Sequence, residues 1–76
     1  MEHIGVLIDS DILIEHLRGN QETTAKIRFM EEEGEYLYTT PINSFELYYG
    51  AYKSKKVEKN IRAVDELLKR LMLLPL

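Results

Sequence analysis

The feature that most constrains the fold is a short apolar run that ends in two carboxylates. Ile4 and residues 6–8 are apolar, with only Gly5 between them, and Asp9 and Asp11 follow. An apolar run without polar alternation predicts a strand buried on both faces, as in a parallel sheet that is covered by helices. Asp9 then lies at the carboxyl end of this strand, where open α/β sheets bind their ligands.

The residues after this strand predict a short helix. Ser10 and Asp11 are common N-cap residues, and residues 12–17, predicted as the helix, are followed by Gly19, which suits a helix C-terminus. Both acids have a structural explanation beside the functional one. Asp9 can accept hydrogen bonds from the backbone of the turn, and Asp11 can cap the helix and interact with its dipole.

The composition excludes several classes of protein. A chain of 76 residues with 45% hydrophobic and 30% charged residues is one globular unit with a small core, so its independent stability is marginal. The absence of Cys excludes a disulfide scaffold and a Cys-based zinc site. No stretch approaches the roughly 20 apolar residues that span a bilayer, and no signal peptide is evident, so we expect a cytoplasmic protein without a membrane partner. The net charge of −3 argues against a protein that coats nucleic acid, but it permits an enzyme that holds a phosphodiester through metal ions.

Asn20 and Gly34 bound a second predicted helix, the first as its N-cap and the second as the residue after its last turn. The apolar residues of this helix are spread too widely for one narrow stripe: Ala25, Ile27, Phe29 and Met30. We therefore expect it to contact two neighbours or a partner. The acidic residues 31–33 are most simply a solvated face, because adjacent acids on a helix point in different directions and do not converge on one ion.

The chain next predicts a strand over residues 35–40, where most residues have high strand propensity. Thr40 followed by Pro41 suits the N-cap and first residue of a helix, which we expect to extend over residues 42–54. Asn43 and Glu46 within it resemble a capping box.

The alternation of strands and helices predicts an α/β protein with right-handed crossovers and a parallel sheet. Both predicted strands then end at the same edge of the sheet. This topology brings the turn that carries Asp9 beside the helix start that carries Glu46.

The third predicted helix has an aromatic face with the spacing i, i+3, i+4, i+7: Phe45, Tyr48, Tyr49 and Tyr52. Such a face is more often core or subunit interface than a platform for stacking RNA bases, and both interpretations stay open. Four lysines lie close behind: Lys53, Lys55, Lys56 and Lys59. They are either solvated or in contact with phosphates.

The fourth predicted helix has the clearest amphipathic pattern in the chain. Its apolar stripe consists of Val57, Ile61, Val64, Leu68 and Leu71. The apolar residues 73–76 that follow indicate the approach to another strand. Because two strands alone do not make a stable sheet, we expect the sequence to end within a fold.

Three segments, residues 7–19, 40–51 and 60–76, carry two acidic motifs in combination. The first motif is an acid that closes an apolar first strand. The second is an acid about one helical turn after a strand, within a Glu-Leu-x-x-Gly-Ala pattern. Together these segments resemble the amino-terminal half of a PIN-domain ribonuclease of the VapC toxin type. The resemblance implies a partial PIN-like, Rossmann-like α/β fold over residues 1–76, with β-α-α-β-α-α order and without its carboxyl-terminal half.

The resemblance also implies a function. It would be a metal-dependent endoribonuclease, the toxin of a toxin–antitoxin pair, with RNA as substrate and with an antitoxin protein and a second copy of the chain as partners. Asp9 and Glu46 would bind Mg²⁺ or Mn²⁺, since these hard ions prefer carboxylate and water oxygens. Asn43 would support the site and Asp11 would line it. His3 and His16 match no catalytic position.

The chain departs from the family in lacking the later segment that supplies the remaining acids. We therefore expect the isolated chain to be a weak or inactive nuclease unless another chain supplies that segment. One alternative is a non-catalytic module that binds a copy of itself or an antitoxin through its third and fourth helices. Another is a haloacid dehalogenase-type phosphotransferase, whose opening motif residues 9–11 resemble, but Ile12 and Leu13 stand where that family has a small pair such as Gly-Thr.

Overall fold

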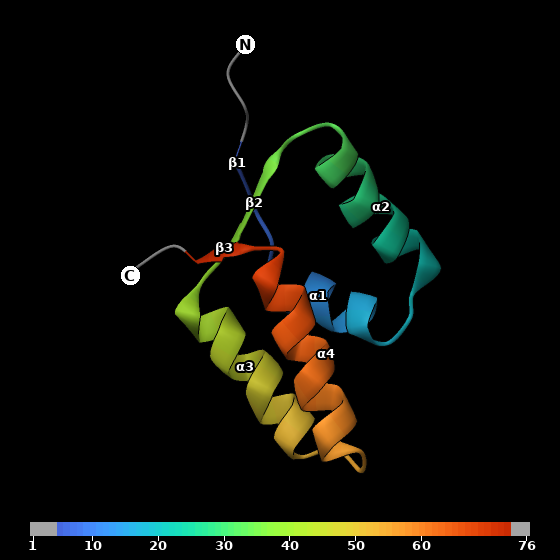
Figure 1. The fold of residues 1–76 in the computed structure, drawn as a ribbon, viewed down its shortest axis with the longest axis vertical. Coiled ribbons are helices and arrows are strands. Elements are labelled where there is room, and N and C mark those ends of the chain that lie inside the picture. Colours follow the sequence, from blue (N-terminus) through green and yellow to red (C-terminus); the bar gives the residue numbers. More distant parts are fainter. Residues whose placement is uncertain (1–4, 74–76) are drawn as a thin grey trace.

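The computed structural model describes residues 5–73, in which strands and helices alternate along the chain (Figure 1). The strands are β1 (Gly5–Leu7), β2 (Tyr36–Thr39) and β3 (Met72–Leu73). The helices are α1 (Ser10–Leu17), α2 (Gln21–Glu32), α3 (Pro41–Tyr52) and α4 (Val57–Lys69). This confirms the predicted β-α-α-β-α-α order, and β3 follows at the start of the apolar tail. The rest of that tail, like Ile4 and His3, lies outside the described residues.

The three strands form one parallel sheet in the order β1-β2-β3, as the sequence predicts. Val6 pairs with Leu37 in the first ladder, and Tyr38 pairs with Met72 in the second. Beyond β1, the backbone N–H of Ile8 still donates to the carbonyl of Tyr38 (2.8 Å). The sheet therefore holds the chain in a fixed direction up to the residue before Asp9.

The two faces of the sheet differ in their burial. Leu37 and Thr39 are buried on the inner face, where Val6 is half-buried against the core. On the outer face Leu7 and Met72 are 53% and 48% exposed. The prediction that the first strand is buried on both faces is therefore wrong. The physical reason is that the described helices pack against the inner face.

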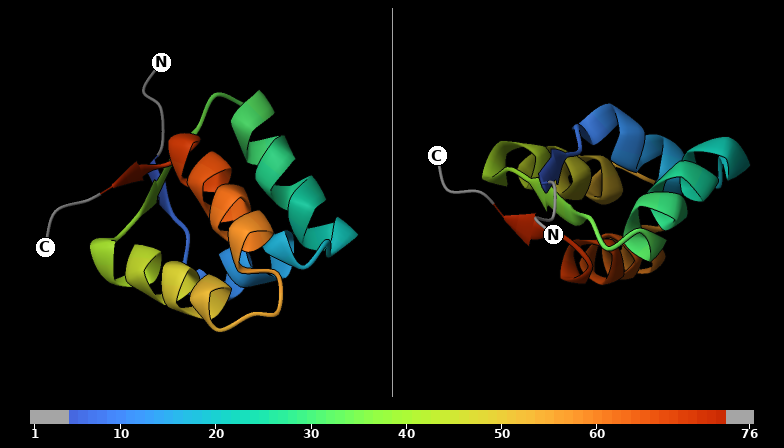
Figure 2. Two further views of the ribbon diagram at one scale, coloured as in Figure 1. Left: turned by 60° about the horizontal axis from the view of Figure 1, so that its bottom comes forward. Right: turned by 90° about the horizontal axis from the view of Figure 1, so that it is seen from above.

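The core lies between the inner face of the sheet and the four helices (Figure 2). It consists of Ile8, Leu13, Ile27, Leu37, Leu47, Ala51, Val64 and Leu67. Helices α3 and α4 lie side by side, and α2 contacts both α1 and β2. The contact of α2 with two neighbours confirms the expectation from its scattered apolar residues.

Two helices are capped as the sequence predicts. The Asn20 side chain accepts a hydrogen bond from the backbone N–H of Thr23 (2.9 Å) at the start of α2. The Thr40 hydroxyl accepts one from the backbone N–H of Asn43 (3.1 Å) at the start of α3. Pro41 is the first residue of α3, where its missing N–H costs no hydrogen bond.

The start of α1 differs from the prediction. Asp9 occupies the N-cap position, and Ser10 and Asp11 belong to the first turn of the helix. No side chain caps this end. The turns after α1 and α2 do contain the predicted left-handed glycines, Gly19 with φ 85° and Gly34 with φ 79°.

The aromatic face of α3 is largely solvent-exposed. Phe45, Tyr49 and Tyr52 are exposed, whereas Tyr48 is half-buried and its hydroxyl donates a hydrogen bond to the carboxylate of Asp65 on α4. This hydrogen bond, together with burial, raises the pKa of Tyr48 above its usual value of 10.0. The core interpretation is therefore wrong for three of the four aromatic residues, and the interface and base-stacking interpretations both remain.

A second polar pair links α2 to the end of α4. The Arg70 Nε donates to Oε2 of Glu31 (3.1 Å), and a second guanidinium nitrogen contacts Oε1. This pairing raises the pKa of Arg70. Glu32 and Glu33 at the end of α2 are thus solvent-exposed, as predicted, whereas Glu31 pairs with Arg70.

His16 should make the stability of the fold depend on pH. Its Nδ1 shares a hydrogen bond with Oγ1 of Thr24 (2.8 Å). Burial lowers the pKa of His16 from its usual 6.5, and the charge of Arg70 acts in the same direction, although Glu31 opposes it. Well above pH 6.5 the ring is neutral in both the folded and the unfolded chain, so its titration does not reduce the free energy of unfolding. Below pH 6.5 the unfolded chain binds the proton more readily, so the free energy of unfolding should fall.

The measurement is thermal unfolding of the wild type and of His16→Asn at pH 7.5 and pH 5.5. We expect the wild type to lose more stability than the variant between these two pH values. An equal loss in the two chains would show that His16 titrates alike in the folded and unfolded states.

Candidate metal centre

Asp9 follows β1 and has an extended backbone conformation, with φ −75° and ψ 160°. Its side chain is exposed and makes no cap hydrogen bond, and it forms no ion pair with the described residues. The alternative explanation, in which this carboxylate satisfies the backbone of the turn, is therefore wrong. The carboxylate is available for an external ligand.

The residues on either side of Asp9 are held by β2 and α3. The carbonyl of Ile8 accepts hydrogen bonds from Oγ1 of Thr39 (3.2 Å) and from Nδ2 of Asn43 (3.3 Å). On the other side, the hydroxyl of Ser10 donates to Oε1 of Glu46 (3.5 Å). Contacts with the end of β2 and the first turns of α3 thus fix the peptide before Asp9 and the residue after it.

Asn43 and Glu46 do not form the predicted capping box. The backbone N–H of Asn43 donates to the hydroxyl of Thr40, and its side chain donates to the carbonyl of Ile8, just beyond β1. The side chain of Glu46 is exposed and its carboxylate accepts from Ser10. The two side chains instead form hydrogen bonds with residues far along the chain, Ile8 and Ser10. The start of the helix needs no capping box, because Thr40 already caps it. The structure therefore places Glu46 against the residue next to Asp9.

Asp11 is exposed in the first turn of α1. A negative charge is stabilised there by the helix dipole, which agrees with its structural explanation. It makes no hydrogen bond with Asn43 or Glu46. Among the predicted site residues, the structure connects Glu46 and Asn43 to the turn of Asp9, whereas Asp11 stands apart from these contacts.

The side chains present at the site decide which kind of metal ion it could hold. Within residues 5–73 no group of three or more His, Cys, Asp or Glu side chains could hold a metal ion. Two carboxylates can still hold an ion that keeps several of its waters, which is the usual state of Mg²⁺ in proteins. Asp9 and Glu46 fit a hard divalent cation of this kind but provide too few protein ligands for a closed structural zinc site.

Two residues at the site were missed by the sequence analysis. Ser10 is 8% exposed and contacts Glu46, and Thr39 is 0% exposed and holds the carbonyl before Asp9. The sequence does contain a signal for both residues, because each hydroxyl stands at or just beyond the carboxyl end of a parallel strand, where ligands bind. Local sequence rules assign Ser10 only to a helix cap and Thr39 only to a strand.

A groove of about 440 Å³ runs between α1, α3 and α4, and Glu46 is one of its lining residues. Its lining is largely apolar and includes Ile14, Leu17, Leu47 and Val64. The groove thus connects Glu46 of the candidate site to an apolar surface.

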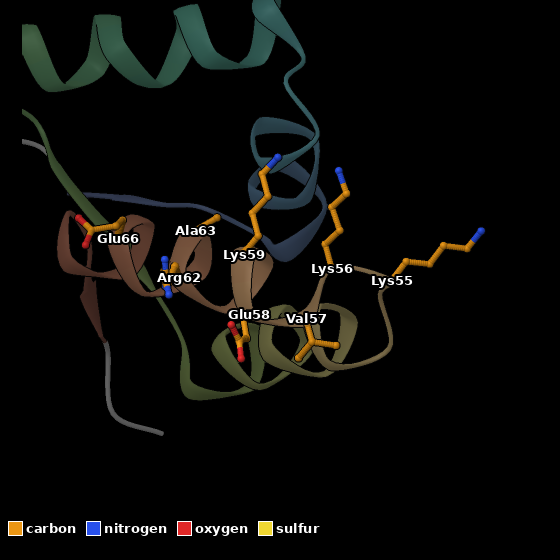
Figure 3. Close-up of a pocket in the computed structure, with 8 residues that line it drawn as sticks. All are labelled: Lys55, Lys56, Val57, Glu58, Lys59, Arg62, Ala63 and Glu66. Carbon is orange, nitrogen blue, oxygen red and sulfur yellow. The ribbon is translucent and has the colours of Figure 1, made fainter.

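A second cavity, of about 730 Å³, lies at the start of α4 and is lined by Lys55, Lys56, Val57, Glu58, Lys59, Arg62, Ala63 and Glu66 (Figure 3). Its four cations form no ion pair with the described residues. Figure 3 shows the side chain of Lys55 pointing away from those of Lys56 and Lys59. The cavity is therefore a broad basic surface, and the carboxylates of the candidate site are not part of it.

Comparisons with known proteins agree with this architecture. The family model of the PIN domain matches residues 6–76. The crystal structure of VapBC2 from Rickettsia felis, bound to a DNA fragment from their promoter, contains a similar chain with a TM-score of 0.82 and 22% sequence identity over 95% of this chain. DNA-bound VapBC from Salmonella typhimurium gives a TM-score of 0.75 and 27% identity over 97% of this chain.

The chain spans about half the length of these solved chains, since the match covers 54% of each of them. No curated protein matches it in sequence. Within the described residues, none of the helices has the length and apolarity needed to cross a membrane.

Proposed function

The chain belongs to the PIN domain family, and on this basis we propose that it is a metal-dependent endoribonuclease and the toxin component of a toxin–antitoxin pair. The observation that carries the proposal is the pair of contacts that flank Asp9. Asn43 holds the peptide before it, and Glu46 contacts the residue after it. These contacts bring the turn that carries Asp9 next to Glu46, which supports a divalent ion shared by the two carboxylates.

Each residue of the site has a role in this proposal. Asp9 and Glu46 hold Mg²⁺ or Mn²⁺, while Asn43 and Ser10 position them and Asp11 lines the site. A bound ion of this kind supplies an activated water and neutralises the charge that develops on the phosphodiester. The chain needs no side-chain nucleophile. The basic cavity at the start of α4 supports RNA as the substrate, because unpaired cations suit the phosphates of its backbone.

The groove between α1, α3 and α4 supports an antitoxin as partner. An amphipathic segment can bury its apolar side chains in such a groove. The solved structures that the chain resembles are VapBC complexes, which gives this partner a precedent. We also propose that the chain acts in the cytoplasm and as a homodimer.

The second candidate is a non-catalytic module that associates with itself or with an antitoxin. It is favoured by the small donor set, since residues 5–73 hold no cluster of three metal-binding side chains. It is also favoured by the exposed aromatic residues of α3. The two candidates differ in whether the chain cleaves RNA.

The test is cleavage of a structured RNA by the folded 76-residue chain in Mn²⁺ and in EDTA. We expect slow cleavage that depends on Mn²⁺, because two carboxylates position the ion less firmly than a full cluster does. Equal cleavage in EDTA would contradict the metal-dependent reaction. A folded chain that binds no Mn²⁺ and cleaves nothing would favour the non-catalytic module.

A further inference from the structure

A third cavity, of about 310 Å³, lies between α1 and α2. It reaches the core, because its lining includes Ile8, Thr23 and Ile27, which are only 4%, 7% and 1% exposed. Ile12 and Met30 add further apolar lining. A recess of this volume that is mostly apolar and carries a few polar groups is typical of a small-molecule site.

The cavity begins next to the candidate metal centre. Ile8 directly precedes Asp9 in the chain, so their α-carbons are about 3.8 Å apart. Ile12 belongs to the first turn of α1, the helix that begins directly after Asp9. A nucleic-acid strand that has one phosphate at Asp9 can therefore place a neighbouring base in this cavity.

One carboxylate at the cavity is held in place and still has an acceptor to offer. The hydroxyl of Thr23 donates to Oε2 of Glu15 (3.1 Å), whereas Oε1 of Glu15 has no partner among the described residues. The other charged residues of the lining, Glu22 and Lys26, form an ion pair with each other (3.7 Å). The cavity thus has excess negative charge. It favours a ligand that donates N–H groups, because an ionised carboxylate only accepts hydrogen bonds.

We propose that the cavity between α1 and α2 binds an unpaired guanine base of the RNA. This base site rests on the proposed function, because it takes RNA as the substrate. Guanine has two adjacent donors on its Watson–Crick edge, N1–H and the N2 amino group, and a carboxylate can accept both in parallel. The flat faces of the base lie against the apolar lining, as they do in pockets that receive splayed-out bases.

The other bases match Glu15 less well. Uracil has a single N–H on this edge, between two carbonyl oxygens. Adenine and cytosine each have a ring-nitrogen acceptor beside the amino group, which the carboxylate repels. Each of these bases therefore makes fewer charge-assisted hydrogen bonds with Glu15 than guanine does.

The same lining disfavours two other occupants. A phosphate group would meet the carboxylates of Glu15 and Glu22, and like charges repel. An arginine side chain of a protein partner has suitable donors, but it would bring a hydrated charge onto the apolar floor formed by Ile8 and Ile27. A neutral base has the donors without this cost.

The first test is titration of the folded chain with GMP and with UMP in EDTA, followed by NMR of the methyl groups of Ile12, Ile27 and Met30. We expect GMP to shift these signals and to bind at least about tenfold more tightly than UMP, because UMP loses one hydrogen bond to a charged group. The titration requires neither a metal ion nor cleavage. A failure of the nuclease proposal is therefore seen separately, in the Mn²⁺ cleavage assay.

The second test is Glu15→Gln, which keeps the shape of the side chain but replaces one acceptor by a donor. It should weaken GMP binding by at least about tenfold. The matched control is Glu32→Gln, because Glu32 is exposed on α2 and does not line the cavity. The control should bind GMP like the wild type. Circular dichroism confirms that both variants fold.

Three results would overturn the base site. The first is a wild type that binds GMP no better than UMP or not at all. The second is a Glu15→Gln chain that binds GMP as tightly as the control. The third is an acetylated arginine amide that shifts the same methyl signals and binds more tightly than GMP, which would assign the cavity to a protein partner.

Discussion

The Asp9→Asn chain is expected to bind Mn²⁺ at least about tenfold more weakly than the wild type, because the site loses one of two carboxylate charges. The substitution keeps the shape of the side chain. The Asp9 carboxylate is exposed and caps no helix, so the fold should be unchanged. Electron paramagnetic resonance of free Mn²⁺ measures the binding directly and does not require RNA cleavage.

Glu46→Gln should weaken Mn²⁺ binding to a similar extent if both oxygens serve one ion. The control is Glu32→Gln, which removes the same charge from an exposed position on α2. It should change the affinity by less than about threefold, since interactions between distant exposed charges are screened by salt. If all three variants bind Mn²⁺ alike, the ion responds only to net charge and the proposed site is wrong.

Leu13→Ala should lower the free energy of unfolding by about 3 kcal/mol, as the removal of a fully buried leucine does in other cores. Leu13 is 0% exposed and lies in the middle of the core. A loss of this size is a large part of the roughly 5 kcal/mol expected of a small domain. Urea unfolding measures this loss. The dependence of the free energy of unfolding on urea concentration should be the same in the wild type and the variant.

The control for this substitution is Ile12→Ala on the same helix. Ile12 is 42% exposed, so we expect a loss below about 1 kcal/mol. If the two substitutions lowered the free energy of unfolding equally, α1 would not pack against the core through the face that carries Leu13.

The sequence predicts best those features that depend on neighbours a few residues away. The caps at Asn20 and Thr40 and the left-handed Gly34 each depend on atoms within one turn of the chain. The parallel sheet follows from the alternation of elements. The sequence also places Asp9 just after a strand and Glu46 in the early turns of the helix that follows the next strand, and the structure has both there.

The remaining features depend on partners far along the chain, and the sequence does not show them. The bonds from Asn43 to Ile8 and from Ser10 to Glu46 span 35 and 36 positions, so both side chains leave the caps that local rules predict. The exposure of Leu7 depends on which face the helices cover. Local propensity contains no information about either choice.

The order β1-β2-β3 has a consequence for where a ligand crevice can form. Each crossover steps in the same direction, and right-handed crossovers that step in one direction lay their helices on one side. In doubly wound proteins the crevice opens where two adjacent connections diverge to opposite sides. Among the described strands no such divergence exists, and it could arise only along the edge of β1 that faces away from β2. Any polypeptide that added a strand there would convert the exposed turn of Asp9 into the floor of a cleft.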